Sequence, residues 1–332
     1  MFNITSLIEA KTNRFIALIL CFSLFGLLLP AGCGQKQRAV DLYVDAVVLK
    51  ELDENEMAIE KLNSIVQLDK RFPLAYSLLG EIYEERKDYE RSAAFYEKAT
   101  ELNPLSFEDY FNLGRVYRIM KKFGPAVRAY VRVCEINPGH FEAHLNAAKS
   151  YYELKDYDGA LAYGQRAEQI NPNVSEVQKL LGDIYELRRD YEQAVRSYKR
   201  SLEIDGSNPD VMISLAVAYI KTNRNEPARE LLTLVTQMQP DNNIAYQHLG
   251  YCYLLLNDVD KAIESYTRAT EINDKDWQAF RGLGVAYMQK ALAGQDEMLK
   301  EKAVEQWRLS LAVNPNQDRR QKLIELIRKY SK

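Results

Sequence analysis

FPLAYSLLGEIYEERKDYERSAAFYEKATELNP, residues 72–104, decides the fold, because the chain repeats this stretch at a fixed interval. A tiny residue recurs every 34 positions, and a tyrosine stands three positions after each one. The small residues are Gly80, Gly114, Ala148, Gly182, Ala216, Gly250 and Gly284, and the tyrosines are Tyr83, Tyr117, Tyr151, Tyr185, Tyr219, Tyr253 and Tyr287. An unbroken period of this length predicts a solenoid of similar supersecondary units.

Each unit is predicted to be a helical hairpin. Apolar or small residues fall at helical spacing in two runs, residues 76–83 and 92–99. The polar residues 86–89 connect the two runs, and Pro104 closes the unit because proline cannot continue a helix. Glycine inside a helix costs about 1 kcal/mol relative to alanine. The recurrent glycine therefore predicts that the two helices of a hairpin approach closely at this position.

Three recurring patterns carry a family resemblance. Leu-Gly-x-x-Tyr runs occupy residues 79–83, 113–117, 181–185, 249–253 and 283–287. Ala-x-x-x-Tyr pairs follow at Ala126/Tyr130, Ala194/Tyr198 and Ala262/Tyr266, and the closing prolines are Pro104, Pro138, Pro172, Pro240 and Pro315. The chain resembles the tetratricopeptide repeat family. This resemblance implies an all-α fold, a right-handed α-solenoid of about eight helical hairpins with a C-terminal capping helix.

The repeats are predicted near residues 39–72, 73–106, 107–140, 141–174, 175–208, 209–242, 243–276 and 277–316, with the capping helix at 317–332. The first repeat is atypical, as terminal repeats usually are. In the eighth repeat the second-helix alanine arrives at Ala303, seven residues late. We therefore expect an insertion in residues 290–302, as either two extra turns of helix or a longer loop.

The N-terminal part does not belong to the repeats. Lys11 and Arg14 precede fifteen uncharged residues, 15–29, which is the length of a signal peptide rather than of a membrane span. Residues 1–32 are thus predicted to be a signal peptide. Small residues ahead of Cys33 resemble a bacterial lipobox, which implies lipidation at Cys33, followed by a polar tether at residues 33–38. Lipoprotein, secreted protein and uncleaved anchor are the three interpretations, and the first predicts an exported protein anchored on the periplasmic side of the membrane.

No residue pattern predicts catalysis. The formal net charge of −3 lacks the clustered basic excess of nucleic-acid binders. The chain has no P-loop and no Gly-x-Ser-x-Gly or Cys-x-x-Cys motif. His140 and His144 are four residues apart, but in the order His-x-Glu-x-His and without a third ligand nearby. The sequence thus predicts no cofactor and no metal site, and we expect Cys134 and Cys252 to be buried and unbridged.

The family resemblance implies a concave groove, lined by the first helix of each repeat, that binds peptides or helices of partner proteins. By position, the predicted groove residues are Phe111, Arg115, Arg118, Lys149, Tyr152, Ile213, Val217, Ile220, Tyr251, Leu254, Leu255 and Met288. The groove changes from charged in repeats two to five to apolar in repeats six to eight. One hypothesis is that the apolar half holds a partner segment while the charged half sets its orientation. The alternative is that these apolar side chains are core.

These observations predict a non-catalytic protein-interaction scaffold at a bacterial envelope membrane. The resemblance extends to repeat lipoproteins that help assemble pili, secretion machines, the envelope or exopolysaccharide systems. An accessory subunit of a glycosyltransferase or another enzyme complex is the alternative. In either case the expected partners are proteins and the membrane, and not nucleic acid.

Overall fold

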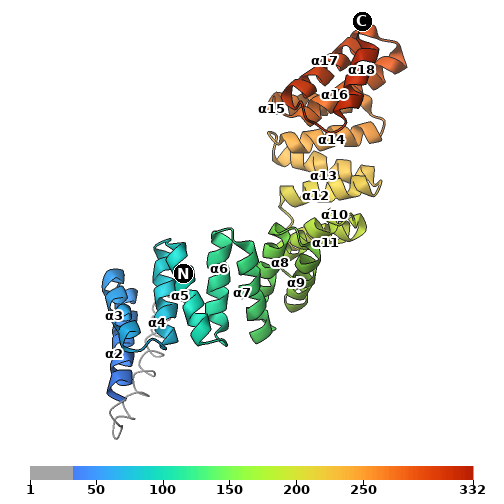
Figure 1. Cartoon of the computed structure of the whole chain (residues 1–332). Helices are drawn as coiled ribbons and strands as arrows, with labels where there is room; N and C mark the ends of the chain where they lie inside the picture. The colour runs from blue at the N-terminus through green and yellow to red at the C-terminus, as the bar shows by residue number, and fades with distance from the viewer. Residues whose placement is uncertain (1–32, 332) are drawn as a thin grey trace, which may run out of the picture. The chain divides into compact units, whose positions relative to one another are not determined.

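The computed structural model describes residues 33–331, which form 17 α-helices and no strand (Figure 1). Successive helices pack as pairs, which confirms the predicted all-α stack of helical hairpins. The helices are α2 (Cys33–Glu51), α3 (Asn55–Leu68), α4 (Pro73–Glu85), α5 (Tyr89–Leu102), α6 (Phe107–Ile119), α7 (Phe123–Ile136), α8 (Phe141–Glu153), α9 (Tyr157–Ile170), α10 (Ser175–Leu187), α11 (Tyr191–Ile204), α12 (Pro209–Lys221), α13 (Asn225–Met238), α14 (Asn243–Leu255), α15 (Val259–Ile272), α16 (Trp277–Gly294), α17 (Glu297–Val313) and α18 (Arg320–Tyr330).

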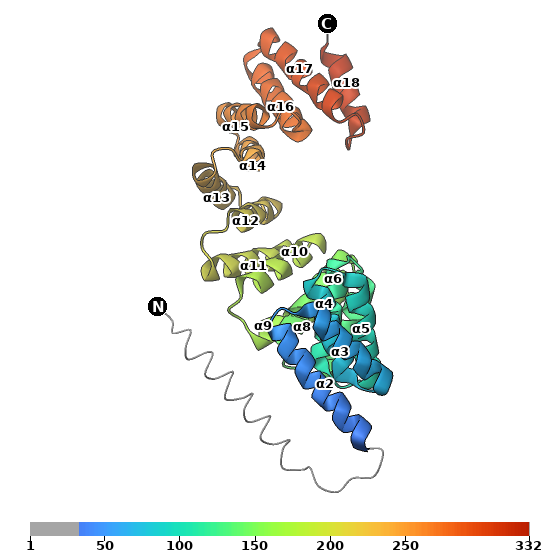
Figure 2. The same ribbon diagram turned by 90° about the vertical axis from the view of Figure 1, so that its left-hand side faces the viewer.

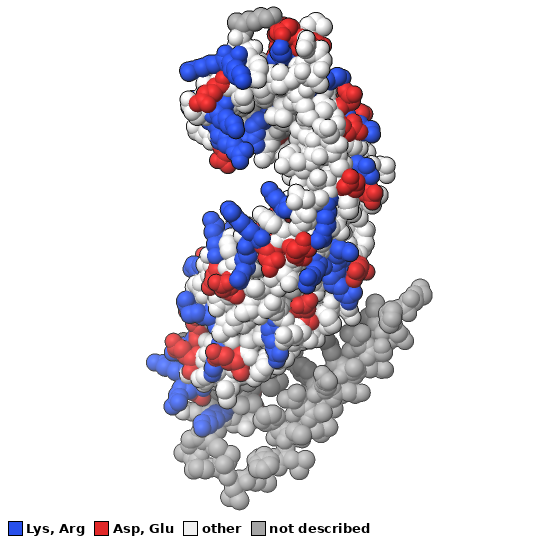
Figure 3. Space-filling model, turned by 90° about the vertical axis from the view of Figure 1, so that its right-hand side faces the viewer, with Lys and Arg blue, Asp and Glu red and all other residues white. Residues whose placement is uncertain are grey.

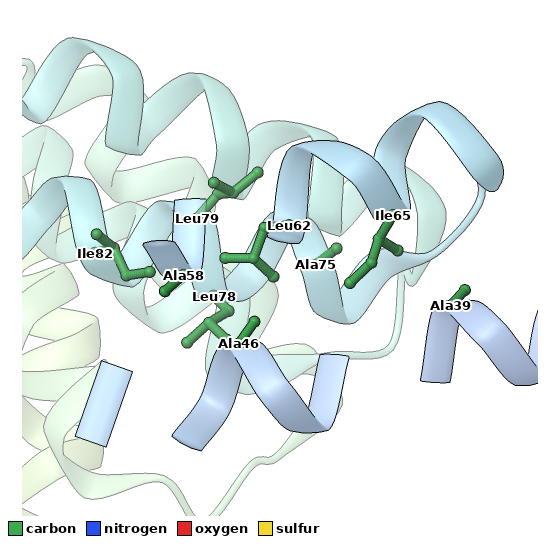
Figure 4. Close-up of a cluster of buried hydrophobic side chains, with 9 residues drawn as sticks. All are labelled: Ala39, Ala46, Ala58, Leu62, Ile65, Ala75, Leu78, Leu79 and Ile82. Carbon is green, nitrogen blue, oxygen red and sulfur yellow. The ribbon is translucent and has the colours of Figure 1, made fainter. Parts of the chain in front are cut away.

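The chain divides into two compact units, residues 1–120 and residues 121–332. The described part of the first unit contains α2 to α6. Its core forms where the first hairpin stacks on the second: Leu62 and Ile65 of α3 lie in one cluster with Leu79 and Ile82 of α4 (Figure 4). The second unit contains α7 to α18, and Figure 2 shows its later helices as consecutive hairpins. Within each unit, neighbouring hairpins bury their apolar faces against one another.

The turn inside each hairpin contains a left-handed residue, and in five hairpins an aspartate caps the second helix, at Asp88, Asp156, Asp190, Asp258 and Asp296. Lys87 has a φ of 61°, in the left-handed region that terminates many helices. The Lys87 and Asp88 amides donate to the carbonyls of Glu84 and Tyr83, at 2.8 and 2.9 Å. Asp88 then begins α5 by accepting a hydrogen bond from the Arg91 amide. Left-handed residues recur at Lys121, Lys155, Arg189, Asn223 and Asn257, so the same turn serves the repeats that follow.

The recurrent glycine makes room for an aromatic ring of the second helix. A Cβ added at Gly80 would lie 2.9 Å from the Tyr96 ring, and one added at Gly182 would lie 2.5 Å from the Tyr198 ring. In the last repeat the ring is that of Trp307, and Gly284 is kept. Where the aromatic ring is absent, the glycine is absent as well, in the buried pairs Ala148/Gly164 and Ala216/Leu232. The close approach predicted from the sequence is therefore a contact between backbone and ring, and its two members change together.

The last repeat contains longer helices rather than a longer loop. Helix α16 has 18 residues and α17 has 17, whereas α4 and α5 have 13 and 14. Only Gln295 and Asp296 separate α16 from α17, and Asp296 accepts a hydrogen bond from the Leu299 amide. Extra helical turns are thus the correct alternative for the insertion. The capping helix is present as α18, which packs on α17 through Leu323 and Trp307.

The structure corrects the predicted start of the repeats. Helix α2 begins at Cys33, so the expected tether at 33–38 is helical, with Gln37 donating a 3.0 Å hydrogen bond to Asp41 one turn later. This stretch has no residue that stops a helix apart from Gly34. Residues 1–32, the predicted signal peptide, lie outside the described residues. Within residues 33–331, no helix combines the length and the apolar character needed to cross a membrane.

Candidate partner-binding groove

One groove of about 660 Å³ lies in the second unit, bordered by α12, α14, α16 and α18. Four predicted groove residues line it: Val217, Ile220, Tyr251 and Leu254. Val285 of α16 continues this apolar surface. The side chain of Ile220 is 7% exposed, so it forms part of the floor. By contrast, Tyr251 and Val285 are 45% and 43% exposed and are open to solvent.

The capping helix forms one wall of this groove. Leu323 and Leu326 of α18 line it, and so do Arg319 and Lys322 at the start of the same helix. The sequence predicts α18 only as a cover for the last open end of the solenoid. Its position beside α14 and α16 depends on the longer helices of the last repeat, whose packing the repeat pattern does not specify. The structure therefore assigns α18 a second role, as part of the groove surface.

The groove border is mainly cationic. Four basic side chains line it, Lys221, Arg281, Arg319 and Lys322, against one carboxylate, Asp318. Lys and Arg side chains gather near the C-terminal end on the face drawn in Figure 3. Within residues 33–331, none of the four basic side chains forms a salt bridge. Sequence reasoning missed Arg319 and Lys322 because it assigned the groove only from the first helices. Lys221 and Arg281 do lie on first helices, α12 and α16, but they were not among the positions carried over from the family.

A sequence signal for these unpaired cations does exist. Helices α14 and α16 contain no aspartate or glutamate, and α12 contains only Asp210. The first helices of earlier repeats carry two or three carboxylates each, as in α4 and α10. A cation facing the last three first helices therefore finds no acidic neighbour on them. This absence of acids could have been read from the sequence.

In the earlier repeats, two of the three predicted cations of the groove are paired. Arg115 contacts Glu84 at 2.8 Å, and Lys149 contacts Glu176 at 2.6 Å, in each case joining the first helices of successive repeats. Arg118 is exposed, and Phe111 and Tyr152 are half-buried. The structure does not bring these residues into the groove of α12, α14, α16 and α18. Their charges are used at least partly to hold neighbouring repeats together.

Three predicted apolar positions lie elsewhere. Ile213 is half-buried against the core beside Leu231, and Leu255 is exposed outside the groove lining. Met288 is the clear correction, because it is only 6% exposed and packs in a cluster with Trp307 and Leu323. The longer α17 and the capping helix cover its side chain. Met288 therefore belongs to the core and not to the groove surface.

A half-buried pair of carboxylates on α10 contacts a tyrosine of α11. The Tyr198 hydroxyl is 2.8 Å from Asp183 Oδ1 and 3.0 Å from Glu186 Oε2. A hydroxyl has one proton to donate, so Tyr198 can satisfy only one of the two carboxyl groups at a time. Asp183 also accepts a hydrogen bond from Lys179 Nζ, at 2.7 Å. Burial raises the pKa of Glu186, and nearby Asp183 adds to this effect, against a hydrogen bond from Tyr198 that lowers it.

The histidines and cysteines singled out in the sequence have structural positions. His140 caps α8 by accepting from the Ala143 amide, and His144 Nε2 lies 3.1 Å from the Pro138 carbonyl oxygen. Cys134 and Cys252 are buried free thiols. Burial raises the pKa of Cys134 to about 12 and that of Cys252 to about 11. Residues 33–331 contain no cluster of three or more side chains suited to bind a metal ion.

Comparison with known families decides what this stack of hairpins is. Tetratricopeptide repeat models match residues 73–106, 95–124, 119–184, 187–249 and 244–276. The chain is a tetratricopeptide repeat protein. Proteins of this family are scaffolds for protein–protein interaction, and the matched ranges include the first two helices of the groove, α12 and α14. No curated protein matches this tetratricopeptide repeat chain in sequence at a significant level.

Solved tetratricopeptide repeat structures share the fold. A repeat protein of Cytophaga hutchinsonii aligns with a TM-score of 0.59 at 16% identity, covering 74% of this chain and 97% of its own. Pseudomonas aeruginosa pilF aligns with a TM-score of 0.50 at 22% identity, covering 62% of this chain and 94% of its own. YrrB, described as having an unusual peptide-binding site, aligns with a TM-score of 0.50 at 20% identity, covering 61% of this chain and 99% of its own. At these identities the likeness establishes the fold alone.

Proposed function

We propose that this protein is a non-catalytic scaffold that binds a segment of a partner protein in the groove of α12, α14, α16 and α18. The observation that carries the proposal is the exposed apolar surface on successive first helices, with Tyr251 and Val285 both more than two-fifths exposed. Contiguous exposed apolar surface usually marks a binding site. These exposures favour the groove hypothesis over the alternative in which the side chains are core.

The dimensions of the groove suit a peptide or a helix. A volume of about 660 Å³ exceeds the volume of a single side chain, and the groove is open to solvent along helices of three repeats. An amphipathic segment binds such a surface by placing alternate or i, i+3 and i+4 apolar residues on it. The peptide-binding site named for YrrB is the same kind of use of this fold.

The proposed location is a bacterial envelope membrane, with the repeats on the periplasmic side. The support is in the sequence: an apolar run at residues 15–29 is followed by small residues and Cys33. A lipid anchor at Cys33 would hold α2, which begins at that residue, next to the bilayer. In this setting the scaffold would gather proteins during assembly of an envelope, pilus, secretion or exopolysaccharide system.

Site-specific photo-cross-linking in intact cells tests the groove. A photoreactive residue at position 251 should capture a discrete partner protein, whereas the same residue at position 313 on α17 should not. The paired substitutions Tyr251→Ser and Val285→Ser should abolish capture by a photoreactive residue placed at 254. The matched control, Leu309→Ser with Val313→Ser, removes exposed apolar side chains from α17 that do not line the groove.

The outcome requires the variants to be folded, so urea midpoints are compared first. The proposal would be contradicted if the groove substitutions and the control substitutions on α17 reduced capture equally. It would also be contradicted if neither pair of substitutions changed capture. Mass spectrometry of the mature N-terminus tests the anchor separately. The proposal requires an acylated Cys33 as the first residue, and an unmodified chain that retains residues 1–32 would disprove the lipoprotein interpretation.

A further inference from the structure

The four cations that border the groove come from separate segments of the fold. Lys221 ends α12, Arg281 lies on α16, and Arg319 and Lys322 lie at the start of α18. In the described part of the chain none of them forms a salt bridge, and Asp318 is the one carboxylate that lines the groove with them. The charge of Lys221 also reaches Glu186 of α10, whereas Arg281, Arg319 and Lys322 have only Asp318 beside them in the groove lining. The groove lining therefore carries an excess of positive charge. A ligand that supplies carboxylates would remove that repulsion.

Arg281 is held in position for such a ligand. Its guanidinium lies 4.9 Å from the centre of the Trp277 ring, and Nη1 donates a 3.4 Å hydrogen bond to the Asp318 carbonyl oxygen. Burial lowers the pKa of Arg281, and the charge of nearby Arg319 lowers it further. The guanidinium remains charged near neutral pH, since an arginine is effectively always protonated. A preorganised, partly desolvated cation forms strong hydrogen bonds with carboxylates.

Resting on the proposed function, we infer that the groove selects an acidic and apolar segment of a partner protein. The carboxylates of that segment bind Arg281, Arg319 and Lys322. Its apolar side chains lie on Tyr251, Leu254 and Val285. The capping helix α18 is then a specificity element, because it supplies two of the cations. In the repeats ahead of α12, the predicted groove cations Arg115 and Lys149 are already paired with carboxylates of neighbouring first helices.

The positive charge of the groove favours an acidic partner segment over two other candidate ligands, the N-terminal residues of the chain and a second copy of it. Residues 1–32 of the chain contain Lys11 and Arg14 but only one acid, Glu9, so they are net basic and would be repelled by the groove. A second copy of the chain would have to present an exposed surface that is both acidic and apolar. Cross-linking from position 251 detects that case directly, because the captured product would be a dimer of the chain, and this result would overturn the inference.

Labelled synthetic peptides provide the test on the purified full-length chain in detergent. One peptide alternates Glu with Leu in an amphipathic pattern, a second carries Gln in place of Glu, and a third carries Lys in place of Glu. Fluorescence anisotropy at low and at physiological salt gives the three affinities. We expect the Glu peptide to bind about tenfold more tightly than the Gln peptide at low salt, with the difference shrinking as salt rises. The Lys peptide should bind least.

Two variants connect this preference to the groove. Arg281→Gln with Lys322→Gln should reduce binding of the Glu peptide about tenfold, while leaving binding of the Gln peptide nearly unchanged. Arg196→Gln with Lys199→Gln makes the same change of charge on exposed positions of α11 outside the groove, and should have little effect. Comparing the two pairs separates a local contact from a change in net charge.

The possible results distinguish the inference from the proposed function. Binding of the Glu and Gln peptides with equal affinity, both weakened by Tyr251→Ser with Val285→Ser, would overturn the acidic preference and leave the groove function standing. Equal weakening by the groove pair and the α11 pair would likewise overturn it. Absence of peptide binding together with absence of cross-linked partner would refute both.

Discussion

The contact between a glycine of the first helix and a tyrosine ring of the second leads to a quantitative prediction. Gly80→Ala would place a methyl carbon 2.9 Å from three atoms of the Tyr96 ring, closer than two carbon atoms approach without displacement. Tyr96 is itself fully enclosed, so the ring cannot swing into solvent. The substitution therefore forces a shift of α5 relative to α4, or a strained side-chain conformation.

Two opposing effects set the magnitude. Inserting a methyl group into a well-packed core costs about 1–3 kcal/mol. Alanine is favoured over glycine in a helix by about 1 kcal/mol. Gly80→Ala is therefore expected to lower the free energy of unfolding by up to about 2 kcal/mol. Gly294→Ala in α16 is the control: an added Cβ there meets nothing within 4 Å and no proline follows, so it should leave stability unchanged or raise it.

A double-mutant cycle isolates the contact. The double variant Gly80→Ala with Tyr96→Leu has the same two residues as the buried Ala216/Leu232 pair at the equivalent positions of repeat six. In the Tyr96→Leu background, Gly80→Ala should become neutral or stabilising, because the ring is gone. The expected coupling energy is about 1–3 kcal/mol, well above the roughly 0.5 kcal/mol seen for independent sites. Gly182→Ala, with its closer contact of 2.5 Å, should be more destabilising than Gly80→Ala.

The assay must resolve one repeat, because solenoids unfold in segments and a single transition is not assured. Hydrogen exchange of the amides in α4 and α5 reports the local free energy of opening. Urea unfolding followed by circular dichroism gives the global value. If Gly80→Ala destabilised α4 and α5 equally in the presence and absence of the Tyr96 ring, the ring contact would not be the reason for the glycine.

Two further predictions concern a half-buried carboxyl group and two buried thiols. Burial raises the pKa of the Glu186 carboxyl in the folded state, so the folded protein binds a proton there more tightly than the unfolded chain does. The free energy of unfolding therefore falls as pH rises from about 4.3 through the raised pKa. Glu186→Gln should therefore stabilise the protein at neutral pH and flatten this dependence in urea titrations, whereas Glu203→Gln, an exposed site on α11, should do neither. Cys134 and Cys252 should resist iodoacetamide in the folded protein, with peptide mass spectrometry detecting alkylation only in urea; rapid labelling without urea would contradict their burial.

The sequence was sufficient for the stack of hairpins because every repeat carries the same local signals. The apolar spacing of residues 76–83 and 92–99 and the closing Pro104 predict the two helices of a repeat without knowledge of their neighbours. The seven-residue insertion was also located from the late arrival of Ala303, although its helical form was one of two alternatives. Repetition makes such predictions dependable, since each position is confirmed by its counterparts.

The groove was predicted less completely, because its surface depends on contacts between repeats. Val217 and Tyr251 follow from their position on first helices, and they do line the groove. Met288 has the same kind of position, but the added turns of α17 cover it. Arg319 and Lys322 lie outside the repeats altogether, so a rule based on repeat position could not include them. The burial and charge of a groove position depend on neighbouring elements, which the 34-residue pattern does not describe.

The same dependence explains where a solenoid of this kind can hold a partner. A cation on a first helix either pairs with a carboxylate on the next first helix or remains available to a ligand. Lys149 pairs with Glu176 of the next repeat, and this salt bridge helps to join the repeats. Lys221 forms no salt bridge with the next first helix, α14, which has no carboxylate to offer, and its charge reaches Glu186 of the preceding first helix, α10. The loss of acids from α14 and α16 therefore exposes apolar surface and leaves cations unpaired at the same place, and these are the two properties that an acidic, apolar partner segment requires.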